Sequence, residues 1–311
     1  MKKNRTTRNL IIGAAAIDTK GVTNKNIAPG VMNPGSIRVH RGGVGRNIAE
    51  NLSRLGIHAR LISAVGDDIS GENILDHAEE SGIDVEHVLI AENTNTGAYI
   101  AVYDEFGQIY VAMYHMGIMN LITPRYLYDR RRLFGEASLV VIDANLPSRT
   151  IDMVFKLAKQ YNVPVCADPT SNALAPKLKP HLADLYMVTP DMGEAEVLTG
   201  TKIVDRMDAM EAAKKLIAQG VDIAVVTQSD KGVCYATQEV TGHMPAIDTE
   251  VTDLTGAGDA MTAAVVFGLM EGFDVDEAIK LGVSAGSLAI QCRETVCPDL
   301  SLELLYDNLR A

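Results

Sequence analysis

Short runs of apolar, mostly β-branched residues alternate along the chain with stretches whose apolar residues recur at helical spacing. This alternation is typical of β–α–β units around a mostly parallel sheet, and it predicts an α/β fold. Strands are expected over residues 10–17, 59–65, 139–143, 163–168, 185–189 and 223–227. Helices are expected over residues 45–55, 69–81, 150–161, 209–219, 260–271 and 275–290.

Two stretches interrupt this rhythm with strand-like patterns that suggest antiparallel pairing. They are residues 35–41 and the pair 97–103 and 108–114, which a turn at 104–107 joins. A small sheet here could be a lid that excludes water or a surface for dimerisation, while an ordinary edge hairpin is the alternative. The expected organisation is one domain over residues 1–311, with the lid formed by 31–41 and 96–116.

Several predicted strands end in polar residues. Asp18 follows the first run, Asn145 lies just after the third strand, and Asp168 ends the fourth. Open α/β sheets bind ligands in the crevice outside the carboxyl ends of their strands. These side chains are therefore candidates for ligand binding.

Composition narrows the range of partners. The 311 residues carry a formal net charge of −12, whereas proteins that bind nucleic acid need a basic surface. No apolar run approaches the ~20 residues needed to span a bilayer. The four cysteines show no C-x-x-C pair and are expected to be reduced. We expect a cytoplasmic protein without nucleic-acid or membrane partners.

The segment Asp253-Leu-Thr-Gly-Ala-Gly-Asp259 stands directly before an apolar helix. Its glycines allow consecutive N–H groups to converge, and the helix N-terminus adds a positive dipole end. Amides of Gly256, Ala257 and Gly258 would then form an anion hole, with Asp259 placed to accept a proton. A glycine turn with a helix-capping aspartate is the structural alternative.

A second glycine cluster, Gly42-Gly-Val-Gly-Arg-Asn47, leads into the helix expected over 45–55. It matches neither the dinucleotide-binding G-x-G-x-x-G motif nor the P-loop. The Asn47 amide can both donate and accept hydrogen bonds, so Asn47 and Asp18 are candidate ligands for vicinal hydroxyl groups.

Together, these two glycine segments resemble the paired signatures of the ribokinase-like family, also called the PfkB carbohydrate kinases. Their order and separation fit that family, as does Thr-Pro-Asp-Met-Gly-Glu at 189–194. The resemblance implies a three-layer α/β/α core with a small β lid, and phosphoryl transfer from ATP with Mg²⁺.

The resemblance also implies roles for individual residues. Asp259 would be the catalytic base beside the anion hole of Gly256, Ala257 and Gly258. The acceptor would be held by Asp18, Gly42, Gly43 and Asn47, with Asn145 and Asp168 contributing at the sugar or phosphate side. The nucleotide pocket would include Asp191, Glu194, Thr227, Ser229 and Gly232.

The same resemblance implies sites for metal ions. Glu194 would organise Mg²⁺ through water, and Asp253 with Thr255 matches part of a monovalent-cation site, so potassium is a further option. The chain departs from the family at two positions: Asp191 stands where asparagine is usual, and Ser229 stands where glycine is expected. Repulsion from Asp191 could weaken ATP binding or favour metal dependence.

Within the family, the segments 33–37, 42–51 and 298–301 are most similar to the pseudouridine kinases. This similarity implies phosphorylation of the 5′-hydroxyl of pseudouridine. Ribose, uridine or a keto-deoxy sugar acid are alternative acceptors, and a nucleoside-binding protein without activity or a scaffold without ligand are the other hypotheses. Side chains that could contact the base are Tyr99, Tyr110, His115 and Met116. A homodimer through the lid sheet is expected.

Overall fold

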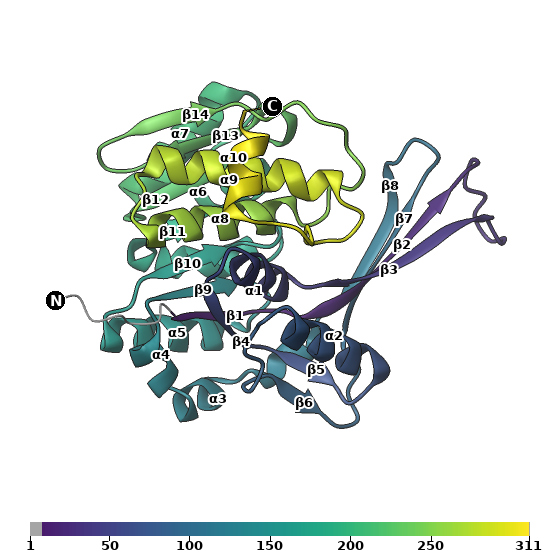
Figure 1. Ribbon diagram of the computed structural model, residues 1–311, viewed down its shortest axis with the longest axis horizontal. Helices are drawn as coiled ribbons and strands as arrows, with labels where there is room; N and C mark the ends of the chain where they lie inside the picture. The colour runs from purple at the N-terminus through teal and green to yellow at the C-terminus, as the bar shows by residue number, and fades with distance from the viewer. Residues whose placement is uncertain (1–7, 311) are drawn as a thin grey trace.

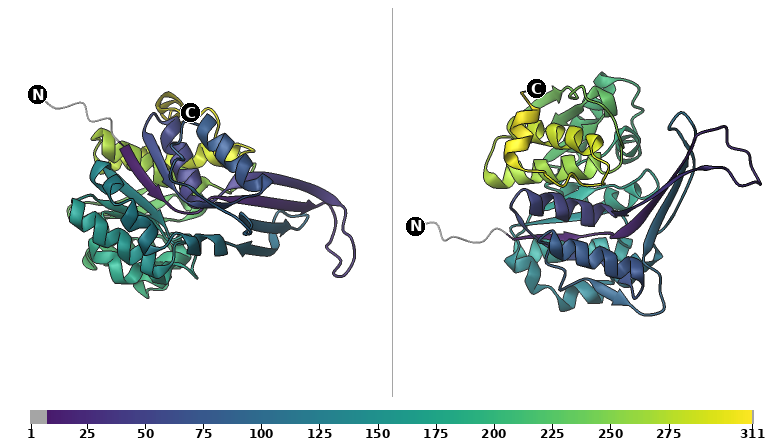
Figure 2. Two further views of the ribbon diagram at one scale, coloured as in Figure 1. Left: turned by 90° about the horizontal axis from the view of Figure 1, so that it is seen from below. Right: turned by 45° about the vertical axis from the view of Figure 1, so that its right-hand side comes forward.

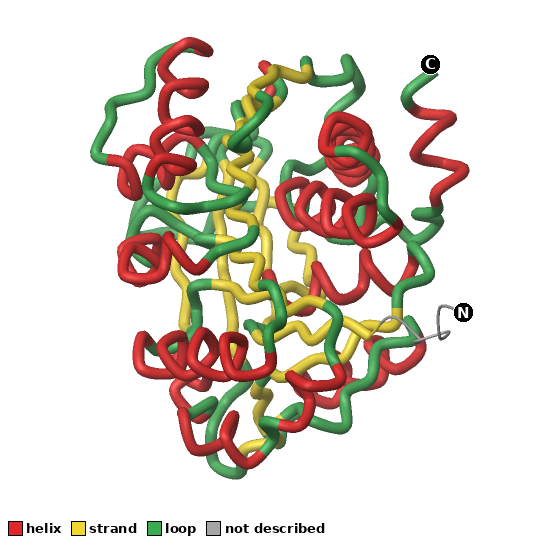
Figure 3. Tube along the Cα trace, turned by 90° about the vertical axis from the view of Figure 1, so that its left-hand side faces the viewer, coloured by secondary structure: helices red, strands yellow, loops and turns green. Residues whose placement is uncertain are grey.

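The computed structural model describes residues 8–310, which form a central sheet covered by helices on both faces (Figures 1 and 3). The sheet has eight strands in the order β14-β13-β12-β11-β10-β9-β1-β4. The strands from β4 to β12 are parallel, and β13 and β14 are added antiparallel. Their bounds are β1 Arg8–Ile12, β4 His58–Ile62, β9 Leu139–Asp143, β10 Val165–Asp168, β11 Met187–Val188, β12 Ile223–Thr227, β13 Val233–Ala236 and β14 Thr241–Met244.

The helices form two layers, each packed on one face of this sheet. One layer contains α3 Pro124–Asp129, α4 Arg132–Glu136, α5 Ser148–Tyr161, the 3-10 helix Ala175–Asp184, α6 Met192–Thr199 and α7 Arg206–Ala218. The other contains α1 Val44–Arg54, α2 Ile69–Glu80, α8 Ala257–Glu271, α9 Val275–Gln291 and α10 Leu302–Asn308. The three-layer α/β/α arrangement confirms the predicted fold class.

Strand β9 shows why the core strands read as unbroken apolar runs. Val140 and Ile142 pack into one helical layer, whereas Leu139 and Val141 pack into the other. Successive side chains of a strand point to opposite faces, so a sheet covered on both sides needs apolar residues at every position. Each such side chain contributes about 1.5–3 kcal/mol by its burial.

A second sheet of four strands projects from one end of the core (Figures 1 and 2). We call it the lid sheet. Its order is β3-β2-β7-β8; β2 pairs parallel with β7, and the other neighbours pair antiparallel. Its strands are β2 Ala16–Thr23, β3 Gly35–Gly42, β7 Gly97–Tyr103 and β8 Ile109–His115.

The prediction of one strand over residues 10–17 is wrong. The chain leaves the central sheet after Ile12 and enters the lid sheet at Ala16, so Asp18 lies within β2 and not at the end of a core strand. The break falls where Gly13 packs against the carboxylate of Asp143 and the backbone of Gly45, leaving no room for a side chain. The apolar run continues through Gly13-Ala-Ala-Ala, so the sequence does not show where the chain passes from one sheet to the other.

The run 59–65 is also divided, into β4 and the short strand β5 Ala64–Gly66, which pairs with β6 Leu89–Ala91. Elements without a clear pattern in the sequence are the antiparallel strands β13 and β14 and the short helices α3, α4, α6 and α10. All four cysteines are free thiols. Among the described residues, no helix combines the length and apolar character that crossing a bilayer requires.

Asp143 fixes the geometry of the β1–β2 junction. Its fully buried carboxylate accepts hydrogen bonds from the N–H groups of Ala14 at 2.6 Å, Gly45 at 2.9 Å and Asn145 at 2.8 Å. The same carboxylate thus holds the chain as it leaves β1, the first turn of α1, and the segment after β9. This places three strand and helix ends beside one another at the carboxyl edge of the sheet.

Replacing Asp143 with alanine would leave three N–H groups without an acceptor, at least two of them buried. We expect the free energy of unfolding to fall by about 3 kcal/mol or more, measured by urea denaturation. Asp143→Asn is the matched control and should lose less, because its amide oxygen still accepts. An alanine variant within about 0.5 kcal/mol of the wild type would contradict this account.

Candidate active site

Helix α8 begins in a conformation that only glycine adopts easily. Gly256 has φ 85° and stands as the N-cap residue, with the carbonyl oxygen of Thr295 packed where a side chain would be. The N–H groups of a first helical turn have no partners within the helix, and the helix dipole makes this end positive. Ala257 and Gly258 in this turn line a cavity, as does Asp259.

The Asp259 carboxylate is held by a chain of buried polar side chains from α1. Asn47 Nδ2 donates to Asp259 Oδ2 at 2.6 Å. The Arg46 guanidinium donates in turn to Asn47 Oδ1, which fixes the orientation of the amide, and it is paired with Glu50 at 2.5 Å. Arg46 is 1% exposed. The first turns of α1 and α8 are thereby joined.

Burial raises the pKa of Asp259 to about 7, although the hydrogen bond from Asn47 lowers it. Asp168, at the end of β10, is buried nearby, and its pKa is raised well above the ordinary range by burial and by the charges of Asp259 and Glu194. Burial and the charge of Asp191 also raise the pKa of Glu194 to about 7. A group whose pKa lies near neutrality can take up and release protons under physiological conditions.

The lid sheet brings Asp18 toward this cluster. Asp18 is 7% exposed, stands opposite Tyr99 in the β2–β7 register, and has its carboxylate against the backbone of Gly42. Its charge contributes to the raised pKa of Asp259. Burial raises the pKa of Asp18 itself to about 6, against the charges of Lys20 and Arg46.

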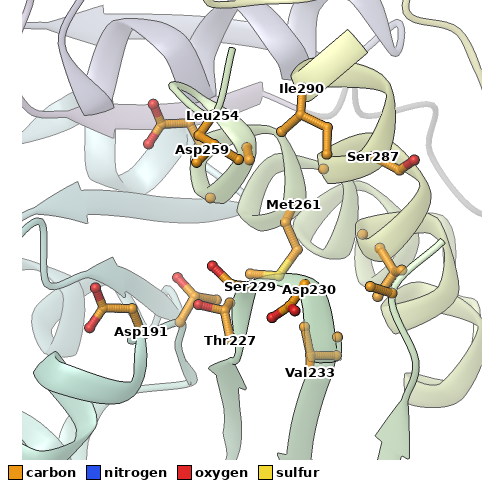
Figure 4. A pocket seen from close by; sticks show the side chains of 18 of the residues that line it. Asp191, Thr227, Ser229, Asp230, Val233, Leu254, Asp259, Met261, Ser287 and Ile290 are labelled. Atoms are coloured by element: carbon orange, nitrogen blue, oxygen red, sulfur yellow. The ribbon is translucent and has the colours of Figure 1, made fainter. Parts of the chain in front are cut away.

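A cavity of about 790 Å³ extends from Asp259 between β12 and α9. Figure 4 shows Thr227, Ser229 and Asp191 along one side, facing Met261 of α8 and Ser287 and Ile290 of α9. Asp168, Glu194 and Gly232 also line it. A volume of this size suits a ligand as large as a nucleotide.

Asp191 and Glu194 form a capping box at the start of α6. Asp191 Oδ1 accepts from the N–H of Glu194 at 2.7 Å, and Glu194 Oε2 accepts from the N–H of Asp191 at 2.9 Å. This explains how a carboxylate can replace asparagine at position 191, since both residues cap helices well. Asp191 still lines the cavity and places a negative charge there.

Ser229 adopts φ 53°, a left-handed conformation that non-glycine residues take at a cost of about 1 kcal/mol or more. The glycine expected at this position would fit without that cost. The backbone shape is therefore retained although the residue type is changed. Thr227 ends β12, and Gly232 follows the short 3-10 helix Ser229–Lys231.

Further predicted residues do not line this cavity. Asn145 donates its N–H to Asp143 and is not among the residues that line the cavity. Tyr110 and His115 are exposed on β8, and Met116 packs against Gly97. Asp253 and Thr255 are held by the ammonium group of Lys20.

Several residues of the site were missed by sequence reasoning. The i,i+4 spacing of Arg46 and Glu50 predicts an ion pair. It does not show that this pair is buried. Thr170 lines the cavity with φ 68°, which no sequence pattern reveals. Lys20 and the α9 residues Ser287 and Ile290 are brought in only by the fold.

The carboxylates fit the expectation of a magnesium ion that is carried by a nucleotide. Glu194, Asp168 and Asp259 supply the hard oxygen donors that Mg²⁺ prefers. Their pKa values are raised by burial first and then by neighbouring carboxylates, and a cation would relieve this second effect. No group of three metal-ligating side chains within residues 8–310 could hold a metal ion by itself. Phosphate oxygens and water would have to complete the coordination.

Comparison with known proteins agrees with this fold and site. Residues 6–300 match the pfkB family carbohydrate kinase. Pseudouridine kinase of Escherichia coli is 34% identical over 94% of this chain and 93% of its own length. Guanosine-inosine kinase of Exiguobacterium acetylicum is 28% identical over 91% of this chain and 94% of its own length.

Solved structures show the same architecture. A carbohydrate kinase from Agrobacterium tumefaciens superposes with a TM-score of 0.83 at 30% identity, covering 98% of this chain and 97% of the other. The ribokinase of Arabidopsis thaliana, complexed with ribose and ATP, superposes with a TM-score of 0.84 at 22% identity, covering 98% and 99%. The fold and site therefore define a sugar or nucleoside kinase. The chain belongs to the PfkB family of carbohydrate kinases, as the paired signatures predicted.

Removal of the Asn47 amide should raise the pKa of Asp259 further, because the carboxylate would lose the hydrogen bond that stabilises its charged form. We expect the wild-type carboxyl group to titrate at about 7 and that of Asn47→Ala at a higher pH. NMR titration of protein labelled with ¹³C at aspartate carboxyl groups measures both, and Asp259→Asn assigns the signal. An unchanged midpoint in Asn47→Ala would show that the bond does not act on the carboxylate.

Proposed function

We propose that this protein transfers the γ-phosphoryl group of ATP to the 5′-hydroxyl of pseudouridine, giving ADP and pseudouridine 5′-phosphate. The observation that carries the kinase chemistry is the position of Asp259. Its carboxylate lies in the first turn of α8, is held at 2.6 Å by Asn47, and lines the cavity together with Ala257 and Gly258. A proton acceptor and an anion-binding helix end therefore coincide.

In the proposed step, Asp259 accepts the proton of the 5′-hydroxyl as its oxygen attacks the γ-phosphorus. The new oxygen–phosphorus bond forms while the bond to the bridging oxygen of ADP breaks. The N–H groups of Gly256, Ala257 and Gly258 would stabilise the charge on the migrating group. A general base contributes ~10²–10⁴-fold to such a rate, and one donor to the anion ~10²–10³-fold.

Acceptor and donor would occupy opposite sides of Asp259. We assign the ribose to the backbone of Gly42 and Gly43 and to the side chains of Asp18 and Asn47. Asp168 and Asn145 would contribute at the sugar or phosphate side. The nucleotide would lie in the cavity beside Asp191, Glu194, Thr227, Ser229 and Gly232. Bound Mg²⁺ would neutralise the phosphates, and Glu194 would orient its water ligands.

The choice of pseudouridine rests on the 34% identity to the Escherichia coli enzyme and on a second pseudouridine kinase, from Arabidopsis thaliana, at 23% identity. The lid sheet supports it physically, because Tyr99 stands opposite Asp18 in the β2–β7 register. An aromatic ring beside the ribose site could stack on a uracil base. Since ATP is the donor, we also propose a cytoplasmic location.

We further propose that residues 31–41 and 96–116 act as a lid on one kinase domain and as a dimer interface. The face of the lid sheet opposite to Asp18 exposes Ile37 to 76%, Val39 to 62% and Met113 to 65%. Exposed apolar patches of this kind mark surfaces that bind another protein. Pairing two lid sheets would cover these side chains.

Asp259→Asn should lower kcat by about 10²–10⁴-fold, because the amide cannot accept the proton of the hydroxyl group. ATP binding should be little changed, since the amide has the same shape and removes a negative charge. ADP release measures the rate, and calorimetry with a non-hydrolysable ATP analogue measures binding. Retention of full speed by the variant would exclude Asp259 as the base.

A panel of acceptors tests the substrate directly. With Mg²⁺ and ATP, we expect ADP release to be fastest with pseudouridine when it is compared with uridine, guanosine, inosine, ribose and keto-deoxy sugar acids. A preference for another acceptor would retain the kinase and replace the substrate. Absence of ADP release with every acceptor would favour a nucleoside-binding protein instead.

A further inference from the structure

Lys20 is a buried cation on the lid strand β2. It stands two residues beyond Asp18, so both side chains point to the same face of the lid sheet. Lys20 is 5% exposed, and its Nζ lies 2.7 and 2.6 Å from the two carboxylate oxygens of Asp253 and 2.5 Å from Thr255 Oγ1. An ammonium group has three N–H donors, and each finds an oxygen acceptor here.

These acceptors are the two side chains that the family resemblance offers to a potassium ion. The donor set, one carboxylate and one hydroxyl group, suits such an ion only while its oxygens are free. Here the ammonium group takes both side chains, and its charge would repel a second cation beside it. A potassium ion therefore does not fit at Asp253 and Thr255 while Lys20 is in place.

We propose that Lys20 supplies the positive charge at this position from within the chain, and that it is a positioning residue for the anion hole. The proposal rests on the function assigned above to the α8 N-terminus, because Asp253 and Thr255 belong to the loop that leads into it. Leu254 of this loop and Asp259 both line the cavity (Figure 4).

The loop is held from two sides. On one side, the N–H groups of Thr252 and Asp253 donate to the carbonyl oxygen of Ile290, at 2.7 and 3.1 Å, and Gly256 packs on Thr295. On the other side, Lys20 holds the loop from the lid sheet. Because Gly256 is the N-cap residue of α8, a shift of the loop would displace the N–H groups of the first turn.

The positive charge of Lys20 also acts on Asp18, on the acceptor side of the site. Burial raises the pKa of Asp18, and the nearby ammonium group of Lys20 opposes that rise. Lys20 thus connects the lid residue proposed to hold the acceptor with the loop proposed to hold the migrating phosphoryl group. Closing of the lid and ordering of the anion hole would be linked through one ion pair.

The test replaces Lys20 with methionine, which has a similar length and no charge. We expect the wild-type rate of ADP release to be independent of added potassium chloride. In Lys20→Met, kcat should fall by about 10²-fold because the loop loses one of its anchors. Potassium chloride should restore part of this rate, whereas tetramethylammonium chloride at equal ionic strength should not.

Two variants serve as controls. Lys20→Arg keeps the charge, so it should show no response to potassium. Lys25→Met removes an exposed lysine that follows the same strand, and it should behave as the wild type. Whichever acceptor the panel identifies is used for all variants, so the identity of the substrate does not decide the result.

Rubidium provides a readout that needs no turnover. Crystals soaked in rubidium chloride should show anomalous scattering between Asp253 and Thr255 in Lys20→Met and none there in the wild type. A rubidium peak at Asp253 in the wild type would overturn the proposal, even if the methionine variant failed to fold. An unimpaired Lys20→Met, or one that neither potassium rescues nor rubidium occupies, would overturn it as well.

Discussion

The contact between the first turns of helices α1 and α8 is the constraint on which the rest of the site depends. Each turn follows a glycine in a left-handed or strained conformation, Gly43 and Gly256, and the hydrogen bond from Asn47 to Asp259 joins them. Arg46 and Glu50 hold Asn47 from inside α1. A helix end that is rich in free N–H groups is thereby fixed beside a carboxylate.

Negative charge is concentrated around this contact, and the positive groups nearby compensate only part of it. Burial raises the pKa values of Asp18, Asp168, Glu194 and Asp259, and the charges of neighbouring carboxylates raise each of them further. The compensation comes from Arg46, the helix end and Lys20. A site of this kind binds triphosphate best when a divalent cation accompanies it, which accords with the donor atoms that line the cavity.

The two departures from the family pattern turn out to preserve backbone geometry. Asp191 caps α6 through its side chain as an asparagine could, and Ser229 takes the left-handed conformation that the expected glycine would favour. Natural sequences tolerate such replacements where the backbone is determined by its surroundings. The cost is local, in strain at Ser229 and in charge at Asp191, and the cavity between β12 and α9 is retained.

The sequence by itself determined the α/β class, the helices of the core and the two glycine segments, because helical spacing and glycine caps are local signals. It also indicated the PfkB family, which the comparisons confirm. The tertiary structure alone decided that residues 10–17 divide between two sheets, since their apolar run is continuous across Gly13. The pairing of Lys20 with Asp253, 233 positions away, was also decided by the tertiary structure alone. The sequence around a lysine in a strand does not show which distant carboxylate it will contact.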